Sequence, residues 1–306
     1  PLHACDGVSL NLSHQPAERL LREAYLEHRF FDLIDLDPFG CPNVLLQSTL
    51  QAMRFGGVLL VASTDGRSPT GHDRCAAVRR FGAAARAHPS SWELALRLQL
   101  AALAREAWLL GRGLEPLFSF SDGRTFRVAV RMRQRIRSGE EQQLGFLARC
   151  DRCGDQAVQA MLDLQGWRPC ACTDGCGRWA VSGPLWIGPL QDGSQIKGLL
   201  EISDGLDAAL SKGLPEGQDL TLAPRSRRLL DGLIADPGQP ACCWSTAELS
   251  RRLQLKGPPA IEPLGAALLA SGHSASVSGV MAGQVRTNAP LGILLRRCSE
   301  FDGKDR

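Results

Sequence analysis

The sequence contains no apolar run near the roughly 18 residues that a membrane-spanning helix requires, and no segment of it resembles a signal peptide. A strong net charge is also missing, because 35 Lys and Arg residues nearly balance 32 Asp and Glu residues and leave +3 at pH 7. We therefore expect no membrane partner, and any affinity for nucleic acid has to come from local basic clusters. The 11 cysteines are an odd number, which favours thiols or metal thiolates in a reducing cytoplasm over disulfides.

The remaining composition is that of a globular protein, with 44% apolar and 22% charged residues. A length of 306 residues is typical of two domains that each bury a core. Arginine greatly outnumbers lysine, which favours planar, bidentate contacts with phosphate. The first residue is Pro1 rather than methionine, so we expect a longer parent protein. Nothing in the sequence indicates an obligate protein partner.

A strand is predicted for the apolar run 30–36, which ends in Asp37-Pro38-Phe39-Gly40. The aliphatic side chains of this run, Leu33 among them, suit a strand that is buried on both faces. Pro38 ends the strand because proline has no N–H to donate to a neighbouring strand. Ligands of open α/β sheets bind at such carboxyl ends, which makes this turn the first candidate for a functional site.

The turn has the chemistry needed to hold a nucleobase by an exocyclic amine. The Asp37 carboxylate and the Pro38 carbonyl can accept the amine N–H groups, and the ring of Phe39 can stack on the base. So short a motif also occurs at ordinary strand ends, which is the alternative. Longer motifs are needed to decide between the two.

A helix over 43–54, ended by a Gly-Gly pair, and a second apolar strand over 58–62 complete a βαβ unit with a right-handed parallel crossover. Thr64 and Asp65 follow the second strand and so lie at the same edge as Asp37. We expect Thr64 and Asp65 to form a polar rim of the substrate pocket. An Asx turn is the alternative for this pair.

Strands over 117–120 and 126–136, joined by a Ser-Asp-Gly turn, predict an antiparallel pair. In the second strand apolar side chains alternate with arginines, so the arginines share one face. Such a stripe suits a phosphate backbone, whereas a charged edge strand protected against aggregation is the alternative. The arginines are Arg127, Arg131, Arg133, Arg135 and Arg137.

Two helices are predicted between these strand pairs. The first, over 74–87, carries Arg74, Arg79, Arg80 and Arg86, which face either RNA or solvent. The second opens with Ser90 and Glu93 at capping-box spacing. Its apolar positions recur with helical period, which predicts packing against the sheet.

Cysteine pairs follow a polar segment, 138–143, where we place a domain boundary. A Cys-x2-Cys-Gly knuckle, followed about twenty residues later by a second cysteine group, is typical of a tetrahedral zinc ribbon. Four thiolates leave zinc no open position, so its role would be structural. The expected ligands are Cys150, Cys153, Cys172 and Cys176, with Cys170 as a rival to Cys172.

Two amphipathic helices and two strands predict a winged-helix-like end to the chain, about residues 244–297. The first of these helices opens with Ser245 and Glu248 at capping-box spacing. The module either binds RNA or is purely structural. The residues that would contact RNA are Arg251, Arg252 and Arg286.

Several short motifs, in order along most of the chain, resemble the tRNA (guanine-26) N2-dimethyltransferase family. The strand and turn at 31–40 are almost those of the family, and a set of colinear motifs makes accident improbable. The others are Thr64-Asp65, Glu93-Leu94-Ala95-Leu96-Arg97, Phe126-Arg127-Val128, Gly183-Pro184-Leu185-Trp186 and Thr287-Asn288-Ala289-Pro290.

The resemblance implies an α/β fold in which a Rossmann-like class I methyltransferase sheet, without its N-terminal strands, occupies residues 1–138. A second, α+β domain over 139–306 would contain the zinc ribbon, about 149–180, together with the winged-helix-like end, and would bind tRNA. The implied reaction transfers methyl groups from S-adenosylmethionine to the exocyclic N2 amine of guanine 26 in tRNA.

The resemblance also assigns roles to residues. Asp37 would orient the amine and help to remove its proton, and Phe39 would stack on the guanine. Asp37, Pro38 and Ala17 would contact S-adenosylmethionine, and zinc would be structural. The residues expected to contact RNA are Thr64, Asp65, Arg127, Arg131, Arg133 and Arg135.

The chain departs from the family pattern at Pro16, where the family has an acid that holds the adenosyl group, and at Trp92, where the family has histidine. A glycine-rich loop and a ribose-binding acid also have no counterpart. A catalytically impaired, zinc-stabilised tRNA-binding protein that lacks a complete S-adenosylmethionine pocket is therefore the alternative. A DNA amino-methyltransferase would share the Asp-Pro-Phe chemistry, but the colinear motifs argue against it.

Overall fold

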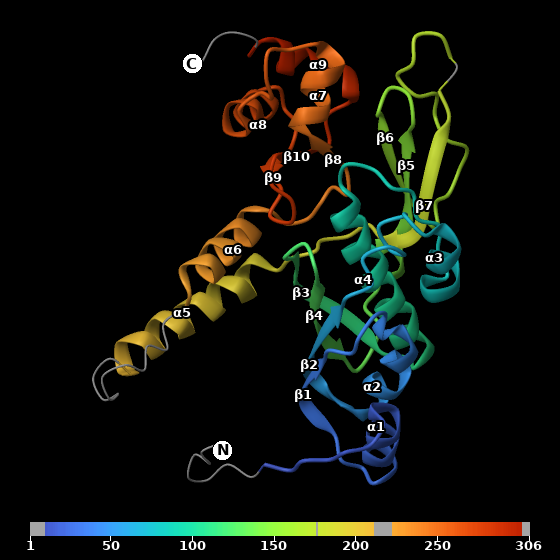
Figure 1. The fold of residues 1–306 in the computed structure, drawn as a ribbon, viewed down its shortest axis with the longest axis vertical. Helices are drawn as coiled ribbons and strands as arrows, with labels where there is room; N and C mark the ends of the chain where they lie inside the picture. The colour runs from blue at the N-terminus through green and yellow to red at the C-terminus, as the bar shows by residue number, and fades with distance from the viewer. Residues whose placement is uncertain (1–9, 176, 211–221, 302–306) are drawn as a thin grey trace.

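The computed structural model describes residues 10–175, 177–210 and 222–301, in which two β-sheets lie on either side of a long helix (Figure 1). The first sheet has the strand order β1-β2-β4-β3. β1 (Phe31–Leu36) and β2 (Met53–Ser63) are parallel, whereas β4 (Phe126–Arg133) and β3 (Gly113–Ser121) run antiparallel. This order joins the expected βαβ unit to the expected antiparallel pair.

The helices of this half gather on one side of the first sheet (Figure 1). They are α1 (Ala17–Leu26), α2 (Leu46–Ala52) after a 3-10 turn at Pro42–Leu45, α3 (Arg74–Phe81) and α4 (Ser91–Leu109). In α4 every residue from Leu94 to Ala104 is buried. A helix that is buried all round requires neighbours on both sides. The first sheet covers one side of α4, and a second sheet covers the opposite side.

The second sheet has the order β6-β5-β7 and is antiparallel throughout. Its strands are β5 (Leu144–Cys150), which follows a 3-10 turn at Glu141–Gln143, β6 (Gln156–Ala160) and β7 (Trp179–Trp186). Leu147, Leu185 and Trp186 belong to the same apolar core as the leucines of α4. The core therefore continues across the expected boundary at 138, and the division into two domains stays a prediction.

A helical hairpin leaves the body of the molecule after β7 (Figure 1). It consists of α5 (Gly193–Leu210) and α6 (Pro224–Ala235). The chain then enters a small module with its own apolar core and a sheet of order β8-β10-β9. Its elements are β8 (Cys243–Ser245), α7 (Thr246–Leu253), α8 (Ile261–Ala270), β9 (Ala275–Val277), β10 (Gln284–Thr287) and α9 (Leu291–Ser299).

Three local predictions are wrong. The helix expected over 43–54 ends at Ala52, and Gly56 and Gly57 lie inside β2; a Cβ at Gly57 would lie 2.9 to 3.2 Å from three backbone oxygens. Leu33 is 59% exposed, because β1 is an edge strand and no described residue covers that side chain. β4 ends at Arg133, so Arg135 lies beyond the strand.

The capping box predicted at Ser90 is also wrong, because the Ser90 side chain makes no cap hydrogen bond and instead donates to the carbonyl of Cys243. Glu93 belongs to a buried ion-pair network. Its carboxylate accepts from Arg286 at 2.8 Å, through both oxygens, and from Arg97 at 2.7 Å. Arg286 also pairs with Asp236 at 2.6 Å. All four side chains are 3% exposed or less, so the prediction that Arg286 contacts RNA is wrong.

This network links distant parts of the chain. Arg97 on α4 donates to the carbonyls of Trp186, Gly188 and Gly238, which lie at the end of β7, just after it and after α6. Arg286 on β10 donates to the carbonyl of Pro240 at 3.0 Å. Two guanidinium groups and two carboxylates balance in charge, which is the condition under which buried ions are tolerated.

Among the described residues, no helix is both long and apolar enough to cross a membrane.

The Glu93 network predicts a dependence of stability on acid. Burial alone would raise the pKa of Glu93, but the guanidinium groups of Arg286 and Arg97 lower it from 4.5 to about 2. A carboxyl whose pKa is depressed in the folded state stabilises the protein at neutral pH, and this contribution is lost as pH falls from 4.5 towards 2. Its full size is about 3 kcal/mol.

Glu93→Gln should lower the free energy of unfolding at pH 7 by about 3 to 5 kcal/mol, because it leaves buried guanidinium groups unpaired. Urea unfolding between pH 2 and 7 measures both the loss and the expected flattening of the pH dependence. Glu262→Gln, at an exposed position on α8, is the matched control. Equal stability of the two variants would show that the network contributes little.

Candidate active site and metal centre

Two hydrogen bonds join the turn after β1 to Thr64, the residue that follows β2. The N–H of Gly40 donates to Thr64 Oγ1 at 2.7 Å, and the carbonyl of Gly40 accepts from the Thr64 N–H at 3.1 Å. Gly40 has φ of +79°, a conformation that favours glycine. As a result the ring of Phe39 is fully exposed, and the side chain of Asp37 is 49% exposed. Neither residue is turned into the protein interior.

An arginine from β4 holds Asp37. Arg127 Nη2 donates to Asp37 Oδ2 at 2.9 Å, and its Nη1 lies 4.0 Å from Asp35 Oδ1. Arg127 faces Ala62 of β2 in the register, so β2 separates the two strands that supply this pair. Among the described residues Asp37 Oδ1 has no partner. The pair therefore orients the carboxylate and leaves one oxygen available to a ligand.

Phe39 lines a cavity of about 420 Å³ at the same edge of the sheet. Basic side chains from α3 and α4 form its far wall. The cavity therefore combines the aromatic surface of Phe39 with positive charge. Aromatic and basic groups together suit a base and its phosphate. Its charged side chains are Arg79, Arg80, Arg105 and Glu106.

Thr64 and Asp65 both have internal partners. Asp65 Oδ1 accepts from the N–H of Ser68 at 3.0 Å, and Oδ2 pairs with Arg80 at 2.6 Å. Burial raises the pKa of Asp65, but these hydrogen bonds and the Arg80 guanidinium lower it below its usual value. The Asx turn named as the alternative is present. A contact of either residue with substrate stays a prediction.

The arginines of β4 alternate with buried residues as predicted. Glu115 of β3 lies between Arg131, at 3.5 Å, and Arg133, so the stripe is partly neutralised. Arg131 also donates to Gln195 of α5 at 2.9 Å. Arg135 is exposed beyond the end of the strand. Their contact with RNA stays a prediction.

The residues expected to contact S-adenosylmethionine lie at the start of α1 and just after the end of β1. Ala17 is the exposed first residue of α1, and Pro16 at its N-cap provides no side-chain hydrogen bond. Asp37 and Pro38 follow β1 and fit the part of the site that the family places on this strand, since Asp37 Oδ1 is available. The contact of these three residues with the cofactor stays a prediction.

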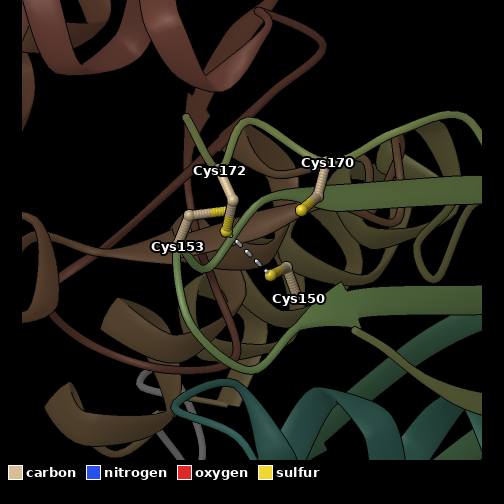
Figure 2. Close-up of side chains that lie close together, drawn as sticks. All are labelled: Cys150, Cys153, Cys170 and Cys172. Atoms are coloured by element: carbon tan, nitrogen blue, oxygen red, sulfur yellow. Dashed lines mark hydrogen bonds between the residues drawn. The ribbon is translucent and has the colours of Figure 1, made fainter. Parts of the chain in front are cut away.

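Four cysteines converge between the second sheet, which contains β5 and β7, and the small C-terminal module (Figure 2). The sulfur atoms of Cys150, Cys153, Cys170 and Cys172 all lie within 4.8 Å of one another. Those of Cys150 and Cys172 are 3.7 Å apart. Zn–S bonds of about 2.3 Å in a tetrahedron place the sulfurs about 3.8 Å apart, so the cluster fits a structural metal ion such as zinc.

Cys170 and Cys172 thus lie in the cluster together, although the spacing made them rivals, and Cys176 lies outside the described residues. Gly177 passes so close that a Cβ there would lie 2.2, 2.7 and 2.8 Å from the sulfurs of Cys170, Cys172 and Cys150. The ligand set stays a prediction.

Hydrogen bonds connect the two cysteine groups. Asp155 accepts from Arg168 at 2.7 and 2.9 Å and from the N–H of Ala171 at 3.1 Å, so it ties the second group to the first knuckle. Burial raises the pKa of Cys150, yet the N–H groups of Cys153 and Arg152 lower it from 9.0 to about 7. A thiol that ionises readily is a good metal ligand.

Sequence reasoning missed one feature of the site and left another open. The pairing of Arg127 with Asp37 had only an indirect signal, the shared face of the alternating strand. Cys170 was named, but only as a rival. Tertiary placement decides both.

The geometry predicts about one zinc ion per chain, lost on Cys153→Ser, because three thiolates bind zinc less tightly than four. Cys170→Ser should also lose the ion, and Cys75→Ser, at an exposed position on α3, should keep it. Elemental analysis of the purified variants measures the metal. Retention in Cys170→Ser together with loss in Cys176→Ser would instead establish the set inferred from spacing.

Comparison with known proteins identifies the family of this chain. The model of the family N2,N2-dimethylguanosine tRNA methyltransferase matches residues 6–298. A tRNA (guanine(26)-N(2))-dimethyltransferase of Thermococcus kodakarensis is 29% identical over 91% of this chain and 66% of its own length; for that of Pyrococcus horikoshii the values are 26%, 93% and 68%. The chain thus spans about two thirds of the length of these curated relatives.

A solved structure shows the same fold. It is the Trm1 protein from Pyrococcus horikoshii in complex with S-adenosyl-L-methionine, with a TM-score of 0.76 and 24% identity over 94% of this chain and 70% of that one. The fold class expected from the sequence is confirmed. The match of the family model over nearly the whole chain confirms the resemblance as well, and the chain belongs to the N2,N2-dimethylguanosine tRNA methyltransferase family.

Proposed function

We propose that this chain acts in transferring methyl groups from S-adenosylmethionine to the exocyclic N2 amine of guanine 26 in tRNA. Its family and the names of its relatives support this function. The observation that carries it is the turn after β1, where Asp37 and Phe39 face outwards beside a basic cavity.

The turn can hold a guanine that is flipped out of the RNA. Asp37 Oδ1 and the Pro38 carbonyl accept the two N–H groups of the amine, which draws the nitrogen lone pair out of the ring. The exposed ring of Phe39 stacks on the base. After transfer the amine nitrogen loses a proton, and Asp37 Oδ1 accepts it. Arg127 keeps Asp37 Oδ2 occupied, so that Oδ1 faces the amine.

The cofactor supplies a methyl group on a sulfonium, which already has a good leaving group. The task of the protein is therefore mainly to position the amine. Asp37, Pro38 and Ala17 would hold this cofactor, and the cysteine cluster would hold zinc in a structural role. A cytoplasmic location, where thiols stay reduced, fits both assignments.

A second candidate is a zinc-stabilised tRNA-binding protein without catalysis. The N-cap of α1 favours it, because Pro16 stands there without a side-chain acceptor for the cofactor. Leu33, exposed on β1, also leaves that side of the sheet open among the described residues. Calorimetry with S-adenosylmethionine separates the candidates, since only the enzyme needs to bind it.

Asp37→Ala should lower methyl transfer at least about 100-fold, because it removes both an acceptor of the amine and the group that takes its proton. Binding of tRNA should be nearly unchanged. Transfer of labelled methyl groups to tRNA and a filter-binding assay measure the two effects. Asp32→Ala, at an exposed position on the same strand, is the control. Wild-type turnover by Asp37→Ala would refute the assignment.

Arg127→Gln tests whether the ion pair positions Asp37. Without it the carboxylate can rotate, so kcat should fall up to about 100-fold while KM for tRNA stays within a few-fold. Arg127→Lys should recover part of kcat, because the charge remains. A rise in KM alone, with kcat intact, would instead place Arg127 in contact with RNA.

A further inference from the structure

A second basic cavity lies between α3 and the cysteine-bearing sheet. It has a volume of about 350 Å³ and is lined by residues of α3, of the segment before α4, and of β5 and β7. Four of the lining side chains are arginines, and Asp151 is the single acid among the described lining residues. They are Arg74, Arg86, Arg149 and Arg178.

Three of these guanidinium groups have no acidic partner among the described residues. Arg149 pairs with Glu248, which also binds Arg252 at 2.7 Å. The side chains of Arg74, Arg86 and Arg178 make no such pair in the part of the chain that the structure describes. Unpaired arginines that converge on one cavity favour an anion, and their planar geometry matches the oxygens of a phosphate.

His88 lines the same cavity. Its Nδ1 accepts from the N–H of Ser90 at 3.1 Å, and its Nε2 is shielded from solvent. Burial and the nearby Arg149 lower the pKa of His88 to about 4, so the ring adds no positive charge at pH 7. The charge that attracts an anion to this cavity therefore comes from the arginines.

A third hollow of about 490 Å³ lies along α3. It shares Arg74 and Arg86 with the cavity described above and Arg79 with the Phe39 cavity. Arg74 and Arg79 of α3, with Arg86 in the segment after it, therefore form a basic surface that borders three adjoining hollows between the turn after β1 and β7.

Hydrogen bonds join the segment after α3 to β7 of the second sheet. The N–H and carbonyl of Ala84 bond to the carbonyl and N–H of Gly183, both at 2.8 Å. The N–H of Arg86 donates to Ser182 Oγ at 3.0 Å. These bonds fix the backbone that carries Arg86 against β7 before any ligand arrives, which lowers the entropic cost of binding at this position.

We propose that the backbone of the RNA substrate runs along α3, from the base pocket at Phe39 to the cavity beside β7, where one of its phosphates binds. The inference rests on the proposed function for the identity of the RNA as tRNA. It goes further by naming the arginines around this cavity, which are Arg74 of α3, Arg86 after it and Arg178 before β7, rather than the arginines of β4, as the main phosphate-binding groups. Glu115 partly neutralises the arginines of β4, whereas Arg74, Arg86 and Arg178 have no acidic partner among the described residues.

The triple variant Arg74→Ala, Arg86→Ala and Arg178→Ala tests this surface. Removing one arginine that binds a phosphate should reduce the slope of log affinity against log salt by about one. Removing all three should cost about 100-fold in affinity for tRNA at about 0.1 M salt. Fluorescence anisotropy of labelled tRNA over a series of salt concentrations measures both values with the chain alone, without S-adenosylmethionine.

The matched control removes the same charge elsewhere. The control variant combines Arg124→Ala, Arg225→Ala and Arg296→Ala. These residues lie in the β3–β4 turn, on α6 and on α9, respectively, and all three side chains are exposed. This control should bind tRNA within a few-fold of wild type. Replacing Arg74, Arg86 and Arg178 by lysine should preserve the salt slope. Thermal unfolding should be the same for all variants, because every substituted side chain is at least partly exposed.

Wild-type affinity and slope in the triple alanine variant would overturn the inference and leave the methyl-transfer assignment intact. An equal loss in the control variant would also overturn it, because overall charge would then explain binding. Conversely, binding that depends on Arg74, Arg86 and Arg178 in a chain that transfers no methyl group would support this surface and refute the proposed function.

Discussion

The buried ion-pair network of Glu93, Arg97, Asp236 and Arg286 is the constraint on which the arrangement of this molecule depends. Arg286 comes from β10 and reaches a carboxylate on α4 that lies 193 positions away in the sequence. None of the four charges is tolerable alone in the interior, since each would lose its hydration without compensation. The network therefore forms completely or not at all. When it forms, it fixes the C-terminal module against the helix that both sheets share.

The turn at Asp37 has the opposite character. It is stabilised by a few hydrogen bonds between Gly40 and Thr64, and its functional groups are turned outwards. This is the expected division of labour, because binding groups work best on exposed loops that a rigid scaffold holds in place. The rigid part here is β2, which lies between β1 and β4 and sets the distance from Arg127 to Asp37. One sheet thus positions both members of the candidate catalytic pair.

Sequence patterns predicted what is local and failed where distant residues decide. Ser245 caps α7 as expected and accepts from the Glu248 N–H, although the Glu248 carboxylate pairs with Arg149 and Arg252 and does not complete the capping box. Ser90 and Glu93 have the same spacing, and Ser90 makes no cap hydrogen bond. Spacing cannot show that Glu93 is taken by Arg286. In the same way, alternation predicted the face on which Arg127 lies, but its partner comes from a strand 90 positions earlier. The β-strands and the turn that follows β1 were predictable because they depend on residues close in sequence.

On the proposed function, the cysteine cluster would contribute to RNA binding through shape rather than charge. The first knuckle follows β5, whose Arg149 lines the basic cavity, and the second precedes β7, whose Trp179 lines it too. Arg252 of α7 donates to the carbonyl of Arg152 inside the knuckle and pairs with Glu248, which in turn holds Arg149. The cysteines therefore lie next to the strand ends that form one wall of the proposed phosphate cavity, while α3 and the segment after it form the other. A zinc ion that takes no part in chemistry would in this way determine where the RNA backbone lies relative to Asp37.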